Sequence, residues 1–293
     1  MSIQAIQILM PVYNAEKYID EAIASLQAQT HAFWELLAID DGSTDQSLDK
    51  LKEWQVKDNR ICIRTRQNKG LVATLNELTE WSTSPIVARM DADDISHPER
   101  LEKQLAALER LDRPGVVACW VSLFGAKQAD WHYRETDPDI RMLMLFGRCP
   151  LIHASLLADR RVFEKHSFNP SFTHLEDLDF LLRLTQDSTF SLYNVQQVLY
   201  SYRQHPDSII YQNVSYRINE YKKRFAVFLR QHANQLTEEQ IQAYMAFVYD
   251  EPMQSASDKT ILQEAFKVML QRYSEQYPNF ETELMRRWER YEK

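Results

Sequence analysis

Glycine is scarce in this chain, and two common phosphate-binding motifs are missing with it. Only 5 glycines occur among 293 residues, whereas an average composition of about 7% would give about 20. The dinucleotide motif GxGxxG and the Walker motif GxxxxGK[ST] both need clustered glycines, because backbone N–H groups must approach phosphate closely. The glycines here never cluster in that way, so any bound nucleotide has to be held by side chains and a metal.

Paired cysteines, long apolar runs and an excess of basic residues are also lacking. The three cysteines are widely spaced and form no CxxC pair, which argues against a disulfide framework or a zinc site and favours the reducing cytoplasm. No stretch approaches 18 uninterrupted apolar residues, and the first residues lack the basic region and cleavage site of a signal peptide. Any membrane contact is therefore expected to be peripheral. The net charge of −8 argues against a nucleic-acid partner.

Short apolar runs alternate with helical patterns in the first half of the chain, which is typical of a parallel sheet covered by helices on both faces. The predicted strands are residues 6–10, 36–39, 61–65, 86–90, 116–121 and 197–203. The predicted helices are residues 16–29, a segment around 48–54, residues 71–81, and a segment that starts at a capping box of Ser96 and Glu99. Helical composition dominates after about residue 208. We expect an α/β domain over residues 1–210 and a helical C-terminal region over residues 211–293.

Acidic residues follow two of the predicted strands. They lie at residues 40–41, after the second strand, and at residues 91–94, after the fourth. Ligands of doubly wound sheets bind beyond the C-terminal ends of the strands. Carboxylates gathered there repel one another unless a cation, a sugar hydroxyl or a base N–H lies between them. An oxygen-rich site suits Mg²⁺ or Mn²⁺ with a diphosphate completing the coordination. A helix N-cap stays an alternative for Asp45 and Asp94.

Six blocks of sequence carry a family resemblance. They are P-V-Y-N-A-E at 11–16, D-D-G-S-T-D at 40–45, N-K-G at 68–70, M-D-A-D-D at 90–94, L-E-D-L-D at 175–179 and Y-R-Q-H-P-D-S at 202–208. In this order and spacing they closely resemble the family 2 glycosyltransferases of GT-A fold, over roughly residues 3–210. The resemblance implies a Rossmann-like, mostly parallel sheet flanked by helices. It also implies an inverting, nucleotide-sugar-dependent transfer, with residues 1–210 as the catalytic domain.

The resemblance implies a nucleoside site built from three of these blocks. Its base and ribose contacts and the wall beside them are expected from Pro11, Tyr13, Glu16, Asp41, Asn68 and Gly70. Asp41 is similar to the acid that accepts a hydrogen bond from the uracil N–H. A core aromatic stays an alternative for Tyr13, and a plain turn residue for Asn68.

The same resemblance implies a diphosphate site. Asp91 would face the ribose or the sugar, and Asp93 would bind the Mn²⁺ or Mg²⁺ that bridges the two phosphates. Arg203 resembles a residue that pairs with phosphate oxygens through its planar fork. His205 would complete the metal shell or donate to the β-phosphate, and a surface role is its alternative.

An inverting displacement needs a base on the acceptor side, because the acceptor hydroxyl loses its proton as the new bond forms. Asp177 is similar to the family's base, and Glu176 is the alternative. Asp177 also stands where a helix over residues 178–184 would begin, so a capping role is the alternative for it, and the two roles are compatible because the carboxylate would lie near the positive end of the helix. His153 is a further candidate, at the border of the acceptor.

These inferences predict a metal-dependent transferase that moves a hexose or N-acetylhexosamine from a nucleotide sugar, with UDP favoured by resemblance. The acceptor would be a saccharide or a lipid-linked saccharide of a cell-surface polysaccharide, such as lipopolysaccharide or capsule. The location would be the cytoplasm. Basic residues accompany the apolar face of a predicted helix at 216–231, which would suit the inner face of the membrane, and a helix packed on the catalytic domain with solvated basic residues is the alternative. Peripheral membrane contact and a homo-oligomer stay open. The alternatives are a catalytically silent sugar-nucleotide-binding or scaffold protein and a nucleotidyltransferase, although the latter's glycine-rich loop is missing.

Overall fold

The chain forms two compact units, which we describe separately. The computed structural model describes residues 5–172, 174–205, 214–253 and 255–292. One unit comprises residues 1–135 with 151–212, and the other comprises residues 136–150 with 213–293. The boundary expected near residue 210 lies outside the described residues.

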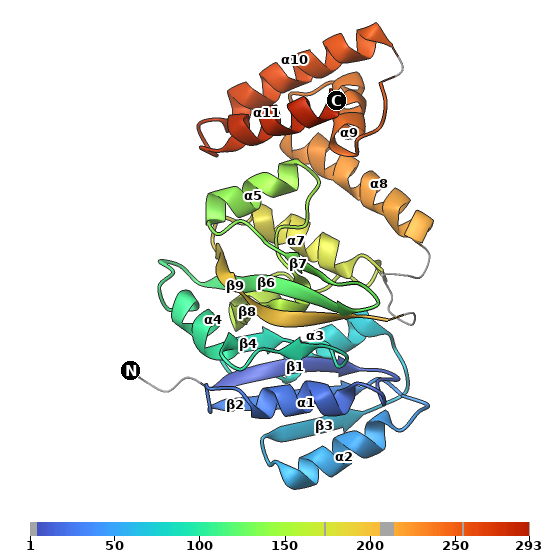
Figure 1. The fold of residues 1–293 in the computed structure, drawn as a ribbon, viewed down its shortest axis with the longest axis vertical. Helices are drawn as coiled ribbons and strands as arrows, with labels where there is room; N and C mark the ends of the chain where they lie inside the picture. Colours follow the sequence, from blue (N-terminus) through green and yellow to red (C-terminus); the bar gives the residue numbers. More distant parts are fainter. Residues whose placement is uncertain (1–4, 173, 206–213, 254, 293) are drawn as a thin grey trace. The chain divides into compact units, whose positions relative to one another are not determined.

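A single sheet, with nine strands among the described residues, organises the first unit (Figure 1). Its strands are β1 (Ile6–Val12), β2 (Trp34–Asp40), β3 (Ile61–Thr65), β4 (Ile86–Arg89), β5 (Ile95–Ser96), β6 (Gly115–Gly125), β7 (Ala129–Trp131), β8 (Leu157–Asp159) and β9 (Ser191–Gln204). The spatial order is β3-β2-β1-β4-β8-β6-β9-β5, with β7 paired to β6. The segment β3-β2-β1-β4 is wholly parallel. Beyond it β8 runs antiparallel to both neighbours, whereas β6 and β9 pair in parallel.

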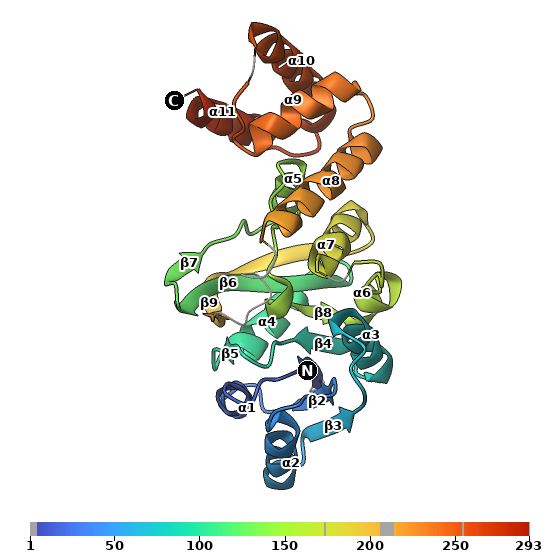
Figure 2. The ribbon, with the colours of Figure 1, turned by 90° about the vertical axis from the view of Figure 1, so that its right-hand side faces the viewer.

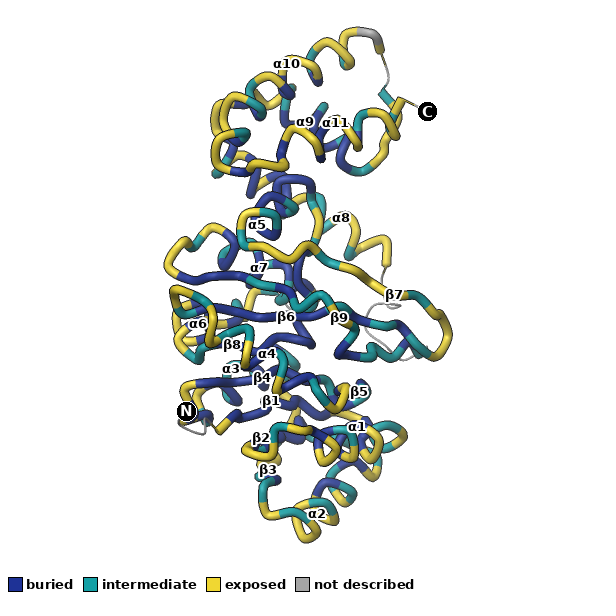
Figure 3. Tube along the Cα trace, turned by 60° about the vertical axis from the view of Figure 1, so that its left-hand side comes forward, coloured by how far each residue is buried: buried dark blue, intermediate teal, exposed yellow. Residues whose placement is uncertain are grey.

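Helices cover both faces of this sheet. They are α1 (Ile19–Gln27), α2 (Ser47–Lys57), α3 (Leu71–Trp81), α4 (Arg100–Leu108), α6 (Arg160–Lys165) and α7 (Glu176–Gln186), with a short 3₁₀ helix at His153–Ser155. Figure 2 shows α1 and α3 on opposite sides of the sheet. Alternate residues of β1, such as Ile6 and Ile8, share one core cluster with Ile19 and Ile23 of α1. The central strands are consequently buried along their length (Figure 3).

Two local predictions were wrong, and tertiary contacts explain both. Ser96 and Glu99 form no capping box, because Ser96 lies in β5 and α4 begins at Arg100 without a side-chain cap. The Ser96 hydroxyl instead accepts a hydrogen bond from the Gln29 side chain at 3.1 Å. The helix expected from residue 16 begins at Ile19, because hydrogen bonds to a neighbouring loop hold residues 14–16.

The second unit is helical. It consists of α5 (Asp137–Leu145), α8 (Val214–His232), α9 (Glu238–Val248), α10 (Ala256–Tyr273) and α11 (Phe280–Tyr291). Capping boxes at Thr237 and Ser255 start α9 and α10. In the core of this unit the Phe146 and Phe280 rings stack with centroids 5.2 Å apart. Within the described ranges, no helix combines the length and the apolar character needed to cross a membrane.

Candidate active site

The strand order gathers three loops at one edge of the sheet. β1 lies between β2 and β4, and all three run in parallel. The loops after Val12, Asp40 and Arg89 therefore leave the sheet at the same edge. Because ligands of such sheets bind beyond the carboxyl ends of the strands, this edge is the candidate active site.

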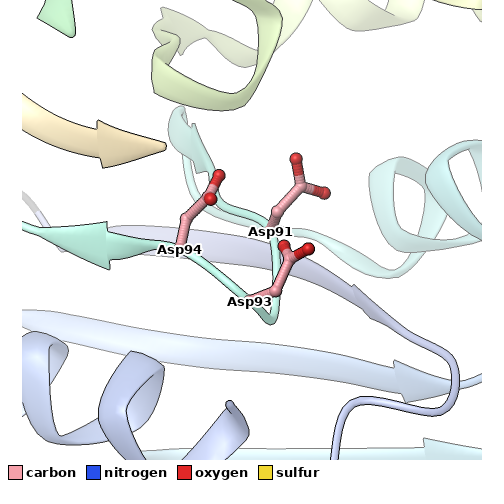
Figure 4. Close-up of side chains that lie close together, drawn as sticks. All are labelled: Asp91, Asp93 and Asp94. Atoms are coloured by element: carbon pink, nitrogen blue, oxygen red, sulfur yellow. The ribbon is translucent and has the colours of Figure 1, made fainter. Parts of the chain in front are cut away.

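Three carboxylates of the loop after β4 converge there. Asp91, Asp93 and Asp94 each offer one oxygen within 4.8 Å of the others. Figure 4 shows the three side chains leaving the loop toward the same side. All the potential ligands in this group are hard oxygens, which suits Mg²⁺ or Mn²⁺ better than a softer transition metal. The donor set therefore fits the predicted cation.

The three acids differ in their partners. Asp91 forms an ion pair with the buried Arg89, and an Asp93 oxygen lies 2.9 Å from Nε2 of His205. Asp94 is buried and accepts hydrogen bonds from the Tyr200 hydroxyl at 2.7 Å and from the backbone N–H of Arg203 at 2.8 Å. Asp94 is therefore the anchor of the loop, while the partly exposed Asp91 and Asp93 are accessible to a ligand.

Burial and mutual repulsion make this cluster unfavourable without a cation. Burial is the main cause that raises the pKa of Asp91 and of Asp94, and the charge of Asp93 raises both further. Arg89 opposes the shift at Asp91. A divalent cation stabilises the charged form of such carboxylates and so reverses this effect.

The end of β9 brings two distant residues to the cluster. β9 pairs antiparallel with β5, which directly follows the acidic loop. Nε of Arg203 donates to the backbone oxygen of Asp93 at 2.7 Å, and its guanidinium lies over the rings of Tyr18 and Phe124 at 4.9 and 4.4 Å. The His205 ring lies 4.7 Å from that of Tyr18. Both expected diphosphate ligands thus contact Asp93.

Hydrogen bonds connect the loop after β1 to the loop after β2. The backbone N–H groups of Asn14 and Glu16 donate to the side chains of Ser43 and Asp45 at 3.0 Å each. In return, the Glu16 carboxylate accepts from the backbone N–H of Gln46 at 2.9 Å. Glu16 was expected to contact the nucleoside. In the structure its carboxylate holds the loop after β1 against the loop after β2.

Tyr13 and Pro11 lie at the end of β1 with different exposure. Pro11 is buried in the strand, opposite Ile39 of β2. Tyr13 follows the strand and is 53% exposed, so the alternative of a core aromatic is wrong. Its ring is accessible to a ligand at this edge.

Asp41 organises the third loop of this group. Its two carboxylate oxygens accept hydrogen bonds from the backbone N–H groups of Lys69 and Gly70, at 2.8 Å each. The guanidinium of Arg66 pairs with the same carboxylate, and Asn68 is exposed beside it. The structure thus brings Asp41, Asn68 and Gly70 together, with the Asp41 oxygens already engaged by protein donors.

Gly42 is a position where this loop needs glycine. Its φ is +73°, and a Cβ there would lie 2.8 Å from the backbone nitrogen of Asn68. We expect Gly42→Ala to destabilise the fold by about 1–2 kcal/mol through the positive φ and by about 1–3 kcal/mol more through overpacking. Asn68→Ala is the control in the loop that Gly42 contacts, since Asn68 is exposed and its φ is not positive, so its loss should stay within about 0.5 kcal/mol. Chemical denaturation should rank Gly42→Ala as the less stable variant, and equal losses would contradict this reading.

Glu176 and Asp177 begin α7, as the two candidate bases. Burial, followed by the charge of Asp177, raises the pKa of Glu176 to about 8. The charge of Asp177 also acts on Asp91, so the start of α7 lies near the acidic cluster. With a pKa of about 8, Glu176 tends to keep its proton at neutral pH, which makes it a poor proton acceptor there.

The raised pKa of Glu176 predicts a pH-dependent stability. The unfolded carboxyl loses its proton near pH 4.5, whereas the folded one keeps it to about pH 8. The free energy of unfolding should therefore fall as pH rises through this window, by up to about 1.4 kcal/mol per pKa unit. Glu176→Gln carries no such proton, so its stability relative to wild type should increase from pH 5 to pH 8.

Urea denaturation in EDTA at several pH values measures this difference. The exposed Glu53→Gln on α2 is the control, and its difference from wild type should change much less over the same window. A Glu176→Gln difference that stays constant from pH 5 to pH 8 would show that Glu176 titrates as an ordinary glutamate.

One further group of the site, Tyr200, was not anticipated from the sequence, whereas His153 was a candidate for the border of the acceptor. Tyr200 is buried, and its hydroxyl accepts from the backbone N–H of Asp91 at 3.1 Å while it donates to Asp94. His153 is buried, its Nε2 lacks a hydrogen-bond partner within the described ranges, and burial lowers its pKa well below the usual value. The alternation of β9 is the signal that could have found Tyr200, because Tyr200 and Tyr202 share a face of the strand.

Comparisons with known proteins agree with this geometry. Residues 7–168 match the model of the family described as glycosyl transferase family 2. The Bacillus subtilis protein named putative glycosyltransferase EpsE is 31% identical over 222 residues, which cover 73% of this chain and 78% of EpsE. The Escherichia coli protein WfgD is named a UDP-Glc:alpha-D-GlcNAc-diphosphoundecaprenol beta-1,3-glucosyltransferase. It is 28% identical over 70% of this chain and 79% of its own length.

A solved structure shares the fold. S. aureus TarS 1–349, crystallised in complex with UDP-GlcNAc, superposes with a TM-score of 0.61 at 17% identity, covering 92% of this chain and 74% of that one. The expected GT-A fold is thereby confirmed. Since the family model spans more than half of the chain and EpsE is similar over nearly three quarters of it, the chain belongs to glycosyl transferase family 2.

Proposed function

We propose that this glycosyltransferase is a metal-dependent, inverting enzyme that moves a hexose or N-acetylhexosamine from a UDP-sugar to a saccharide or lipid-linked saccharide acceptor. The observation that carries the proposal is the convergence of Asp91, Asp93 and Asp94 at the edge where the β1, β2 and β4 loops meet. The choice of UDP is supported by the name of WfgD and by the UDP-GlcNAc complex of TarS.

The nucleoside would lie against the loops after β1 and β2. The exposed ring of Tyr13 is available for stacking on a base, beside Pro11 and the loop that Glu16 fixes. Asp41 holds Gly70 and positions the exposed Asn68. Asp41 would reach a uracil N–H only through an oxygen lone pair that its protein donors leave open.

The diphosphate would lie over the loop after β4. Asp93 would hold Mn²⁺ or Mg²⁺, with His205 beside it as a candidate further ligand. Asp91 would face the ribose or the sugar and lies close enough to reach the same cation, and Asp94 fixes the loop. Such a cation neutralises charge on the departing diphosphate. Arg203 and His205 lie against Asp93, and their N–H groups would donate to phosphate oxygens.

Asp177 would accept the proton of the acceptor hydroxyl. Its place in the first turn of α7 keeps the carboxylate near the positive end of the helix. Because its pKa is raised to about 8, Glu176 would keep its proton at neutral pH. It would then donate a hydrogen bond to the acceptor and help to orient it, but it would not remove the proton. The acceptor attacks from the face opposite the diphosphate, so the anomeric configuration inverts.

We assign donor binding and transfer to residues 1–210, and acceptor, membrane-surface or oligomer contacts to the helical region 211–293. The acceptor class follows the printed substrate of WfgD, a lipid-linked saccharide. With such an acceptor the enzyme would act in cell-surface polysaccharide synthesis, and its proposed location is the cytoplasm, at the inner face of the membrane. Lys223 and Arg230 of α8 are exposed, and each pairs with an acid, Glu220 and Glu238, so contact with an anionic surface would have to compete with these ion pairs.

Release of UDP from a panel of UDP-sugars, with Mn²⁺ and with EDTA, tests the proposal. We expect slow release even without an acceptor, because water can replace the acceptor hydroxyl, and we expect that EDTA abolishes it. A catalytically silent sugar-nucleotide-binding protein would bind UDP-sugars without release. A nucleotidyltransferase would release no UDP either, and it would form pyrophosphate only when supplied with a nucleoside triphosphate and a sugar 1-phosphate. Either outcome would remove the assignment.

A further inference from the structure

Two aromatic side chains lie side by side on one face of the sheet, next to the candidate active site. Trp131 of β7 and Tyr202 of β9 have ring centroids 6.4 Å apart and an interplanar angle of 28°. β6 runs between their strands, with Val121 opposite Trp131 and Leu123 opposite Tyr202. Residues two apart in a strand share a face, as do cross-strand neighbours, so both rings lie on the Val121 and Leu123 face.

Tyr202 connects this pair to the acidic cluster. It shares its face of β9 with Tyr200, whose hydroxyl bonds to Asp94 at 2.7 Å. After burial, the nearby charges of Asp91, Asp94 and Asp93 are what raise the pKa of Tyr202. Tyr202 is half-buried, and its ring packs against the core and against Trp131. Among the described residues its hydroxyl has no hydrogen-bond partner.

Trp131 is the accessible half of the pair. It is 37% exposed, on a three-residue edge strand, whereas an aromatic that serves only the core would be covered. The neighbouring aromatics are engaged elsewhere. Trp120 donates its indole N–H to the backbone oxygen of Tyr133, and Phe124 is covered by the guanidinium of Arg203.

A pyranose ring matches such a surface. One of its faces presents C–H groups, whose burial against an aromatic ring is favourable, and its hydroxyls bond to phenol and carboxylate oxygens at the rim. A half-exposed indole beside a phenol and carboxylates offers both kinds of contact. The strand order favours the acceptor over the donor, because β4 and its acidic loop separate β1 and β2, which carry the nucleoside loops, from β6 and β7.

We propose that Trp131 and Tyr202 form a stacking platform for a pyranose ring of the acceptor saccharide. This inference rests on the proposed function, since it needs a donor site beside the acidic cluster. The indole stacks on the C–H face of the sugar, and the Tyr202 hydroxyl bonds to a hydroxyl at its rim. The platform thereby holds the acceptor next to the carboxylates where transfer takes place.

Binding of methyl glycosides tests the platform separately from catalysis. The probes are the α- and β-methyl pyranosides of glucose, galactose, mannose, N-acetylglucosamine and N-acetylgalactosamine, added to the protein with UDP and Mg²⁺. Saturation-transfer NMR detects those that bind, and titration gives their Kd. We expect Trp131→Ala to raise the Kd by about ten-fold or more, and Trp131→Phe to stay within about three-fold of wild type because the stacking face is kept.

Phe33→Ala is the matched control, since Phe33 is a 51% exposed aromatic of the same unit, outside the site. It should change no Kd, and UDP affinity should be the same in all variants. The platform is wrong if no probe binds wild type, if Trp131→Ala binds them as tightly as wild type does, or if Trp131→Ala loses UDP-sugar affinity instead. If the wild-type protein failed to bind UDP, that result would count against the proposed function. Measuring glycoside binding and UDP binding separately therefore distinguishes failure of the platform from failure of the proposed function.

Discussion

Asp177→Asn should lower the rate of sugar transfer by about 10²- to 10⁴-fold, the usual contribution of a general base, while UDP affinity stays within about two-fold of wild type. The amide keeps the size and the hydrogen-bonding place of the side chain at the start of α7, but it cannot accept the acceptor's proton. Turnover at saturating donor and acceptor, together with calorimetric UDP binding, measures the two effects separately.

Asp179→Asn provides the matched control for this experiment. Asp179 lies in the same first turn of α7, but its carboxylate pairs with Arg183 at 2.6 Å. Its replacement should lower stability slightly and leave turnover within a few-fold of wild type. If Asp177→Asn turned over like Asp179→Asn while Glu176→Gln lost activity, Glu176 would be the base.

Asp93→Asn should lower turnover by at least about 100-fold and remove the effect of Mn²⁺ on UDP affinity. Asp93 is partly exposed, and its carboxylate is held toward the other two acids by His205. An amide offers only a neutral oxygen to a divalent cation. The rate of UDP release as Mn²⁺ is titrated gives both the loss of rate and the loss of apparent metal affinity.

Asp49→Asn is the control for a change of one charge on the protein. Asp49 is exposed on α2 and has only a loose pair with Lys52 at 3.6 Å. It should titrate with Mn²⁺ as wild type does. An Asp93→Asn protein that kept the wild-type Mn²⁺ response would show that the acidic loop serves only to cap and order the chain.

Much of the first unit follows from local patterns. The strands of its parallel segment are short apolar runs, and α3 was predicted at its observed bounds because its apolar residues recur at helical spacing. The acids at residues 40–41 and 91–94 were correctly expected at one edge, since consecutive parallel strands end on the same side.

The remaining geometry depends on contacts that are distant in sequence. β5 is only two residues long and exists because β9, about 100 residues later, pairs with it. That pairing replaced the expected capping box at Ser96, and it also carries His205 to Asp93. The spacing of residues within a short segment cannot predict a contact between segments so far apart in the sequence. The roles expected for Arg203 and His205 therefore rested on resemblance alone.

The sequence did not predict that Trp131 and Tyr202 lie together, for a related reason. Trp131 lies in a three-residue strand, which is too short to give a periodic signal. Its neighbour Tyr202 is 71 positions away in the sequence, and only the pairing of both strands with β6 brings them together.

The central claim is that the acidic loop after β4 binds a diphosphate through a divalent cation. Calorimetric titration of UDP into the wild-type protein, once with Mn²⁺ and once with EDTA, tests this claim. We predict an affinity at least about ten-fold tighter with Mn²⁺, and the difference should disappear when Asp93 is replaced. Equal affinities in Mn²⁺ and EDTA would contradict the account, because the three carboxylates could then have no part in holding the donor.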